Sequence, residues 1–167
     1  VIIVNGMSKG FAMTGWRIGY MAADADIAKS CMKIQGQFTS GANSFGQVAA
    51  AYALDHGIYK EMVDEFNERR KVFLKLLKEV PGFKVNEPTG AFYLFPDISY
   101  YFGKSNGKIT INNSIEFSEY LLQEAHVATV AGTPFGAPEC LRFSYATSME
   151  NIVEAAKRIK EFVKGFE

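Results

Sequence analysis

The short segment from Gly6 to Gly19, which joins two strongly apolar runs, carries a hydroxyl, an amine and a guanidinium that could take part in chemistry. Ser8 and Lys9 follow the first run, and Arg17 lies near the start of the second. A lysine at the end of a buried strand is expected to lose part of its hydration. This loss favours the neutral amine and makes the lysine a candidate nucleophile or Schiff-base former. A hydroxyl and a planar guanidinium can together hold a phosphate. The same residues also suit a solvated loop with a structural ion pair, and spacing alone leaves both interpretations open.

A second candidate is Arg142, in the apolar stretch from Leu141 to Ala146. Strand alternation predicts that Leu141 and Phe143 share one face, while Arg142 lies on the other face with Ser144. An arginine at such a position is most often an edge or surface residue. Position alone therefore predicts a structural role.

The sequence contains no metal-ligand or nucleotide-binding motif. Cys31 and Cys140 lie far apart, and neither His56 nor His126 has a second ligand at a suitable spacing. The segment around Lys9 does not follow the G-x-x-x-x-G-K-[ST] pattern of a phosphate-binding loop. No metal is therefore expected, and two isolated cysteines are typical of a reducing, cytoplasmic setting.

Composition limits the partners of the chain. Its 167 residues include 18 basic and 18 acidic side chains, and 48% are apolar. A net charge of zero without a basic cluster gives no attraction for nucleic acid or an anionic membrane. No apolar run approaches the roughly 18 residues of a spanning helix. We expect a soluble protein with a small-molecule partner.

The candidate residues need buried elements to position them. Residues 1–4 and 16–23 read as strands covered on both faces, as in a parallel sheet. Asp24 is placed to cap a helix that reaches Phe38, and a helical pattern runs from Ser44 to Val80 with a joint at His56 and Gly57.

Downstream of Pro81 the pattern becomes α+β. A final helix is predicted to open with capping-box spacing from Thr147 to Glu150. The other expected elements are strands at 83–85, 91–95, 127–131 and 141–146, a loop at 103–113 and a helix at 114–125.

The segment from Gly6 to Tyr20 resembles the lysine signature of class I and II aminotransferases, the fold type I enzymes that use pyridoxal 5'-phosphate (PLP). Ser8, Lys9, Ala12, Gly15, Arg17 and Gly19 stand at the spacing of that signature. The resemblance implies that Lys9 holds PLP as a Schiff base and is catalytic, and that Ser8 and Arg17 bind the cofactor phosphate. Gly6 stands where some members have a further phosphate-binding serine.

The stretch from Arg142 to Ala146 resembles the aminotransferase pattern R-[LIF]-S-[YFL]-A. The resemblance implies that Arg142 binds the α-carboxylate of the substrate as a bidentate pair. Residues 127–136 resemble the strand and P-G-x-x-F-G loop that precede this arginine, with Ala131 in place of proline. Residues 90–93, Gly-Ala-Phe-Tyr, resemble a small-domain strand near the substrate entrance.

The resemblance implies an α/β fold in three parts. Residues 1–43 would be a remnant of the large PLP-binding domain, residues 44–82 bridging helices, and residues 83–167 a small α+β domain. The chain opens on buried apolar residues instead of methionine. We therefore expect a carboxy-terminal part of a larger protein, whose full-length form is a homodimer and whose isolated 167-residue piece is inactive.

The function implied is transfer of an amino group between an amino acid and a 2-oxo acid. The residues of the signature are most similar to those of bacterial aspartate aminotransferases, which favours aspartate and 2-oxoglutarate as substrates. The alternatives are an aromatic or broad-specificity aminotransferase and a PLP-dependent lyase of the same scaffold. A non-catalytic regulatory or structural role of the chain is a further alternative.

Overall fold

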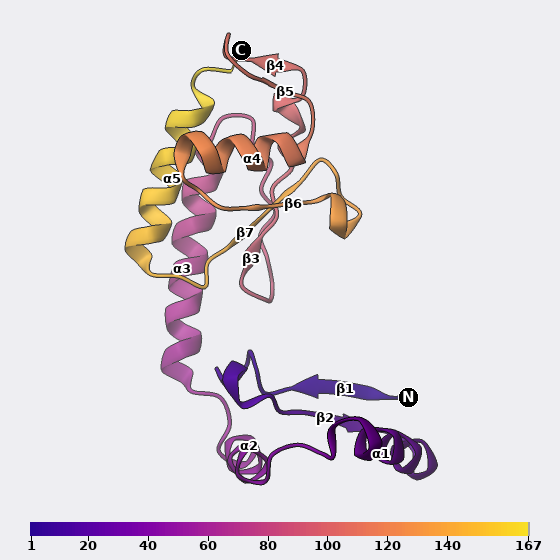
Figure 1. Ribbon diagram of the computed structural model, residues 1–167. Coiled ribbons are helices and arrows are strands. Elements are labelled where there is room, and N and C mark those ends of the chain that lie inside the picture. The colour runs from indigo at the N-terminus through magenta and orange to yellow at the C-terminus, as the bar shows by residue number, and fades with distance from the viewer. Residues whose placement is uncertain (167) are drawn as a thin grey trace. The chain divides into compact units, whose positions relative to one another are not determined.

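The computed structural model describes residues 1–166 and divides into two compact units, residues 1–63 and residues 64 onward. Each unit mixes helices with short antiparallel strands, which confirms the α/β class (Figure 1). The expected division at residues 43 and 82 stays a prediction.

The first unit contains a two-stranded antiparallel ribbon. Strand β1 (Ile3–Gly6) pairs with β2 (Gly19–Ala22), and Gly6 lies opposite Gly19. A Cβ atom at Gly19 would lie 3.1 Å from the Asn5 carbonyl oxygen, so glycine suits the close approach of the two strands. The expectation that both strands are buried is wrong for this structure. Val4 is 76% exposed, because each strand has only the other as a partner within residues 1–166.

Two helices complete the first unit. Helix α1 (Ala25–Thr39) is capped by the Asp24 carboxylate, which accepts from the Asp26 amide, as the sequence predicts. Helix α2 (Ser44–His56) is capped by Asn43 and ends at Gly57, where φ is 78°. The predicted joint at His56 and Gly57 is therefore confirmed, since glycine adopts this conformation without steric cost.

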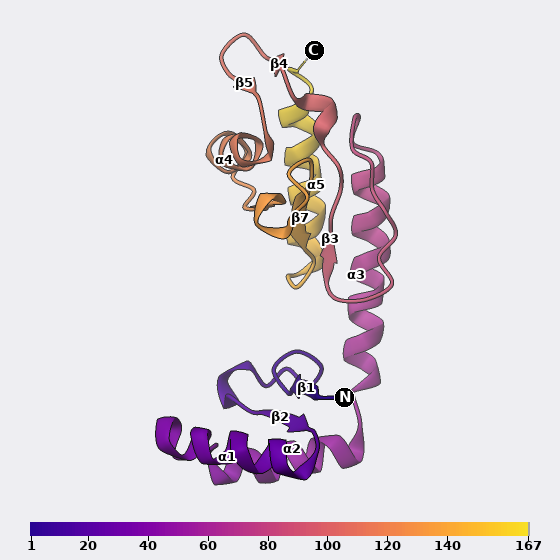
Figure 2. The ribbon, with the colours of Figure 1, turned by 90° about the vertical axis from the view of Figure 1, so that its right-hand side faces the viewer.

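The second unit is built on a three-stranded antiparallel sheet in the order β3-β7-β6. Its strands are β3 (Tyr93–Leu94), β6 (Val130–Ala131) and β7 (Leu141–Ser144). A separate hairpin joins β4 (Lys104–Ser105) to β5 (Thr110–Ile111). The helices are α3 (Lys60–Lys78), which begins before the unit boundary, α4 (Ser114–Ala125) and α5 (Met149–Val163). Figure 2 shows the same elements turned by 90°.

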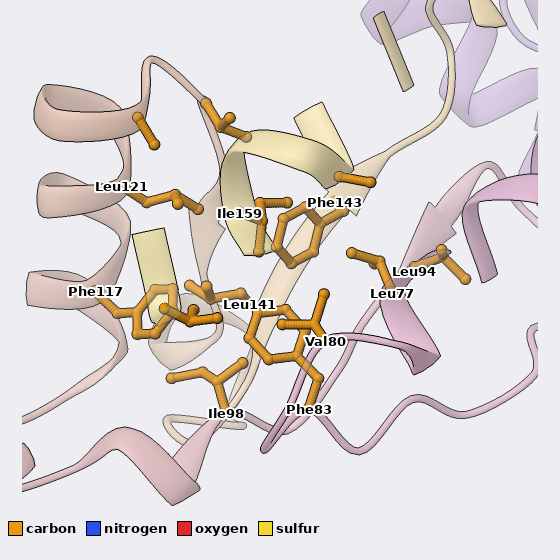
Figure 3. Close-up of a cluster of buried hydrophobic side chains, with 14 of the residues drawn as sticks. Leu77, Val80, Phe83, Leu94, Ile98, Phe117, Leu121, Leu141, Phe143 and Ile159 are labelled. Carbon is orange, nitrogen blue, oxygen red and sulfur yellow. The ribbon is translucent and has the colours of Figure 1, made fainter. Parts of the chain in front are cut away.

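Buried side chains from the helices and the sheet meet in one core. Phe143 of β7 packs edge-on against Phe73 of α3, with 5.9 Å between the ring centroids. Figure 3 shows Phe117 of α4 and Ile159 of α5 directed into the same cluster. The apolar positions of α5 recur every three or four residues, at Ile152, Ala156, Ile159 and Val163, which lie on one helical face.

Three local expectations are corrected. The predicted strand at 83–85 is a single bridge between Lys84 and Asp97, because Pro81 and Gly82 form a turn just before it. The predicted loop at 103–113 contains the β4–β5 hairpin, which has Gly107 at its turn with φ of 85°. Ser148, not Thr147, caps α5 by accepting from the Asn151 amide.

The buried hydroxyl of Ser114 gives a test of this core. Ser114 is fully buried at the start of α4, and its Oγ has no hydrogen-bond partner within residues 1–166. Ser114→Ala should raise the free energy of unfolding by about 1 kcal/mol, because an unsatisfied polar group is removed.

Ser118→Ala is the matched control in the same helix. The Ser118 Oγ lies 3.1 Å from the Thr129 carbonyl oxygen and 2.9 Å from the Thr129 hydroxyl. Its loss should lower the free energy of unfolding by about 1 kcal/mol. Urea denaturation measures both effects, and destabilisation by Ser114→Ala would contradict the assignment.

Candidate active site

Ser8 and Lys9 lie in a turn that begins directly after β1. The Phe11 amide donates to the Met7 carbonyl over 3.3 Å, and the Ala12 amide donates to the Lys9 carbonyl over 3.2 Å. Met7 is fully buried and packs with Met13, Ile18 and Ala50 of α2. This packing fixes the backbone that carries Lys9.

One hydrogen bond brings Ser8 and Arg17 toward each other. The Met7 amide donates to the Ile18 carbonyl over 3.1 Å. Ser8 follows Met7 and Arg17 precedes Ile18, so the two residues flank this bonded pair. The structure thus brings Ser8, Lys9 and Arg17 into one loop.

Arg17 has an unusual backbone conformation. Its φ is 56° and its ψ is 46°, in the left-handed region, at the end of the 3-10 helix η1 (Thr14–Trp16). Its Nη1 donates to the Thr14 carbonyl over 2.9 Å. The preceding Trp16 carbonyl accepts from the Asn43 side-chain amide over 3.0 Å, which ties this turn to the start of α2.

The side chains of the loop differ in exposure. Ser8 is half-buried, whereas Lys9 and Arg17 are exposed. The expected partial burial of Lys9 is therefore wrong for this structure, because the strand that precedes it lies on the surface. The donor set suits an anionic ester that carries an aldehyde: an amine, a hydroxyl and a guanidinium, with no acidic residue from position 7 to position 18.

Arg142 lies in the second unit, at the centre of the three-stranded sheet. Its neighbours along β7, Leu141 and Phe143, are 0% and 3% exposed, while Arg142 is half-buried and Ser144 exposed. The predicted alternation is confirmed. β7 thus directs Arg142 away from the core.

The guanidinium of Arg142 contacts two aromatic rings. Its Cζ lies 4.5 Å from the ring centroid of Tyr93 and 4.6 Å from that of Phe135. Phe135 belongs to the 3-10 helix η3 (Thr133–Phe135), which follows β6. Sequence reasoning missed both rings as neighbours of Arg142. The pairing of β3 with β7 is the signal that could have identified Tyr93.

The donors of Arg142 are unused within residues 1–166. Each of the other four arginines in the chain donates a hydrogen bond: Arg17 to Thr14, Arg69 to Glu65, Arg70 to Asn67 and Glu87, and Arg158 to Glu154. Arg142 has neither such a bond nor an ion pair there. A half-buried cation with free donors is suited to an anionic ligand.

A separate cavity of about 400 Å³ lies in the second unit beside the end of α5. Its lining includes Tyr100, Tyr101, Glu79 and Lys160. The Lys160 ammonium hydrogen-bonds the Glu79 carboxylate over 2.5 Å and lowers its pKa, and burial raises the pKa of Tyr101 to about 12. None of the four candidate residues lines this cavity.

Residues 1–166 offer neither a metal site nor a membrane-spanning helix. In this part of the chain, no three His, Cys, Asp or Glu side chains gather as a metal site would require. None of its helices combines the length and the apolar character needed to cross a membrane.

Comparison with known proteins places the chain in a family. The family "Aminotransferase class I and II" matches residues 1–159. A bifunctional aspartate aminotransferase and glutamate/aspartate-prephenate aminotransferase of Petunia hybrida is 48% identical over an alignment of 166 residues, which covers 96% of this chain and 35% of that protein. An aspartate aminotransferase of Pyrococcus horikoshii is 42% identical over 98% of this chain and 41% of its own length.

Solved structures agree with the sequence comparisons. The aspartate aminotransferase of Rhizobium meliloti superposes with a TM-score of 0.94 at 37% identity, covering 99% of this chain and 42% of that protein. The chain thus spans about two fifths or less of the length of these relatives. Because the family match extends over nearly all of its residues, the chain belongs to the class I and II aminotransferases.

Proposed function

We propose that the protein containing this chain transfers an amino group between an L-amino acid and a 2-oxo acid, with aspartate and 2-oxoglutarate as the favoured pair. The observation that carries the proposal is the half-buried Arg142 guanidinium, whose donors are unused within residues 1–166. A carboxylate common to amino acids and 2-oxo acids fits these donors as a bidentate partner. The names of the relatives support aspartate as substrate.

The proposed cofactor is PLP. When bound, it supplies an electron sink for the charge that develops at the substrate α-carbon. The amine of Lys9 would attach covalently to its aldehyde, and the Ser8 hydroxyl and Arg17 guanidinium would bind its phosphate. This assignment is supported by the three donors in one loop that lacks acidic residues.

Lys9 would transfer protons, and Arg142 would bind and orient the substrate. When its amine is free, Lys9 Nζ would take the proton that the substrate α-carbon loses and hold it for return. Arg142 would hold the carboxylate and so fix the orientation of the α-carbon bonds.

The proposal extends to the assembly, its setting and its domains. We propose a cytoplasmic homodimer, with residues 1–43 in the cofactor-binding domain and residues 83–167 in the small domain. Both cysteines are free, with Cys31 exposed and Cys140 buried, which fits a reducing compartment. Sedimentation of the full protein tests the dimer.

The role of Lys9 predicts a single labelled peptide. Borohydride treatment of the full protein loaded with PLP should fix the cofactor to Lys9. Lys9→Ala should remove this label and reduce transamination by roughly a hundred- to ten-thousandfold, the usual contribution of a positioned acid–base group. Lys29→Ala, at an exposed lysine on α1 that pairs with Asp26, is the control and should change neither result. Label on any other lysine would end the assignment.

Arg17→Ala should weaken PLP binding about ten- to a hundredfold, since a hydrogen bond to a charged group contributes roughly 1.5 to 3 kcal/mol. Alanine and arginine both carry a Cβ, so the left-handed backbone is strained similarly in the two proteins. Fluorescence titration with PLP measures the change. Arg17→Lys should lose less affinity because it keeps the charge. Cofactor affinity equal to the wild type in Arg17→Ala would count against the phosphate role.

Arg142→Ala should leave PLP bound but lower kcat/KM for aspartate about thirtyfold to several thousandfold, a loss of about 2 to 5 kcal/mol of transition-state stabilisation, because the substrate carboxylate loses its partner. Arg142→Lys should also be poor, since a point charge cannot replace a two-pronged contact. The control is Arg158→Ala on α5, where the arginine pairs with Glu154. Steady-state kinetics with near-normal efficiency in either Arg142 variant would show that the substrate binds elsewhere.

A further inference from the structure

We propose that Tyr93 and Phe135 are positioning residues for Arg142, and that their rings hold the guanidinium while leaving its N–H donors available to a carboxylate. The inference rests on the proposed function, because it concerns how Arg142 receives the substrate. It starts from the two ring contacts, at 4.5 Å and 4.6 Å from the guanidinium carbon.

The type of neighbour explains why the donors of Arg142 remain unused. A carboxylate beside an arginine takes up its N–H groups and offsets its charge, as Glu154 does for Arg158. An aromatic ring attracts the cation through its quadrupole and consumes no N–H donor in a conventional hydrogen bond. Two rings therefore restrict the guanidinium without occupying the groups that a substrate carboxylate needs.

Tyr93 is held in place by the sheet. It lies opposite Ser144 in the antiparallel pairing of β3 with β7, and Arg142 lies two residues before Ser144 on the same face. Tyr93 is thus a diagonal cross-strand neighbour of Arg142. The next pair, Leu94 with Phe143, is buried on the opposite face, so register and burial together fix the Tyr93 ring beside the guanidinium.

Phe135 is held by a tight loop. The Gly132 amide donates to the Cys140 carbonyl over 2.7 Å, and the Phe135 amide donates to the Gly132 carbonyl over 2.8 Å. A Cβ atom at Gly132 would lie 2.0 Å from the Ala137 carbonyl oxygen, so only glycine fits there. The loop therefore has little freedom to move the Phe135 ring.

The exposure of Phe135 argues against a purely structural role. Its side chain is 49% exposed, and it belongs to neither buried apolar cluster. Its ring contacts are with Arg142 and, edge-on, with Phe95 at 6.1 Å between centroids. The ring therefore contributes little to the core, whereas it contacts the Arg142 guanidinium directly.

The test compares variants that lose a ring with variants that keep one. In the full protein loaded with PLP, Tyr93→Leu and Phe135→Leu should each raise KM for aspartate about three- to tenfold, the range that a lost cation–π contact predicts. Their kcat should stay within about twofold of the wild type, because a loosely held guanidinium weakens binding more than chemistry. Tyr93→Phe and Phe135→Tyr keep a ring and should keep KM within about twofold.

A second readout does not depend on catalysis. Calorimetry with succinate, an unreactive dicarboxylate, should give a dissociation constant that rises in the two leucine variants by the same factor as KM. Tyr100→Leu is the matched control: its ring is 51% exposed, contacts the Lys104 ammonium at 4.2 Å, and does not touch Arg142. This variant should bind succinate as the wild type does.

The outcomes separate the two proposals. If Arg142→Ala binds succinate as well as the wild type, the substrate-binding role of Arg142 is wrong. If Arg142→Ala loses succinate while both leucine variants bind it normally, only the role of the rings is overturned. The role of the rings is also overturned if the ring-retaining variants are impaired as much as the leucine variants, or if the leucine variants lose thermal stability with unchanged KM.

Discussion

The alternation of side chains along β7 is the constraint on which the second unit depends. Leu141 and Phe143 are buried against helices on one face, and this burial forces Arg142 onto the other face. A shift of one residue in the register would bury the guanidinium among apolar side chains at a large desolvation cost. The apolar core therefore also sets the direction of the charged group. The four residues of β7, Leu141–Ser144, thus determine both the packing of the core and the direction of Arg142.

The loop that carries Lys9 is specified in a different way. It joins the two strands of the β1–β2 ribbon, and its shape comes from backbone hydrogen bonds, the buried Met7 and the side-chain amide of Asn43. Backbone N–H and C=O groups need hydrogen-bond partners, and in this loop many of them find those partners within the loop. Most of the contacts that shape the loop around Ser8 and Arg17 lie within the loop itself, while Asn43 and Ala50 add contacts from the start and the middle of α2.

The sequence predicted the long elements better than the short ones. The helix at 114–125 has the predicted bounds, and α1 is capped by Asp24 as expected, because caps and three- to four-residue spacing are local signals. Strands of two residues, such as β4 and β5, are defined by their pairing with each other and are too short to show an alternating pattern of apolar residues in the sequence. The surroundings of Arg142 were beyond sequence reasoning for a similar reason. Phe135 contacts Arg142 because hydrogen bonds of Gly132 close the loop between β6 and β7. The spacing of residues in the sequence does not predict these hydrogen bonds.

The left-handed conformation of Arg17 sets folding and binding against each other. A residue with a Cβ in this conformation costs roughly 1 to 2 kcal/mol relative to glycine, which adopts it freely. The sequence that would make the loop most stable thus has glycine at position 17, and that glycine would remove the guanidinium. Selection for stability alone would favour the loss of this arginine, and only selection for activity would oppose it. Stabilising substitutions selected without an activity screen should therefore accumulate at position 17. The left-handed backbone of Arg17 is thus a cost in stability that the proposed function requires.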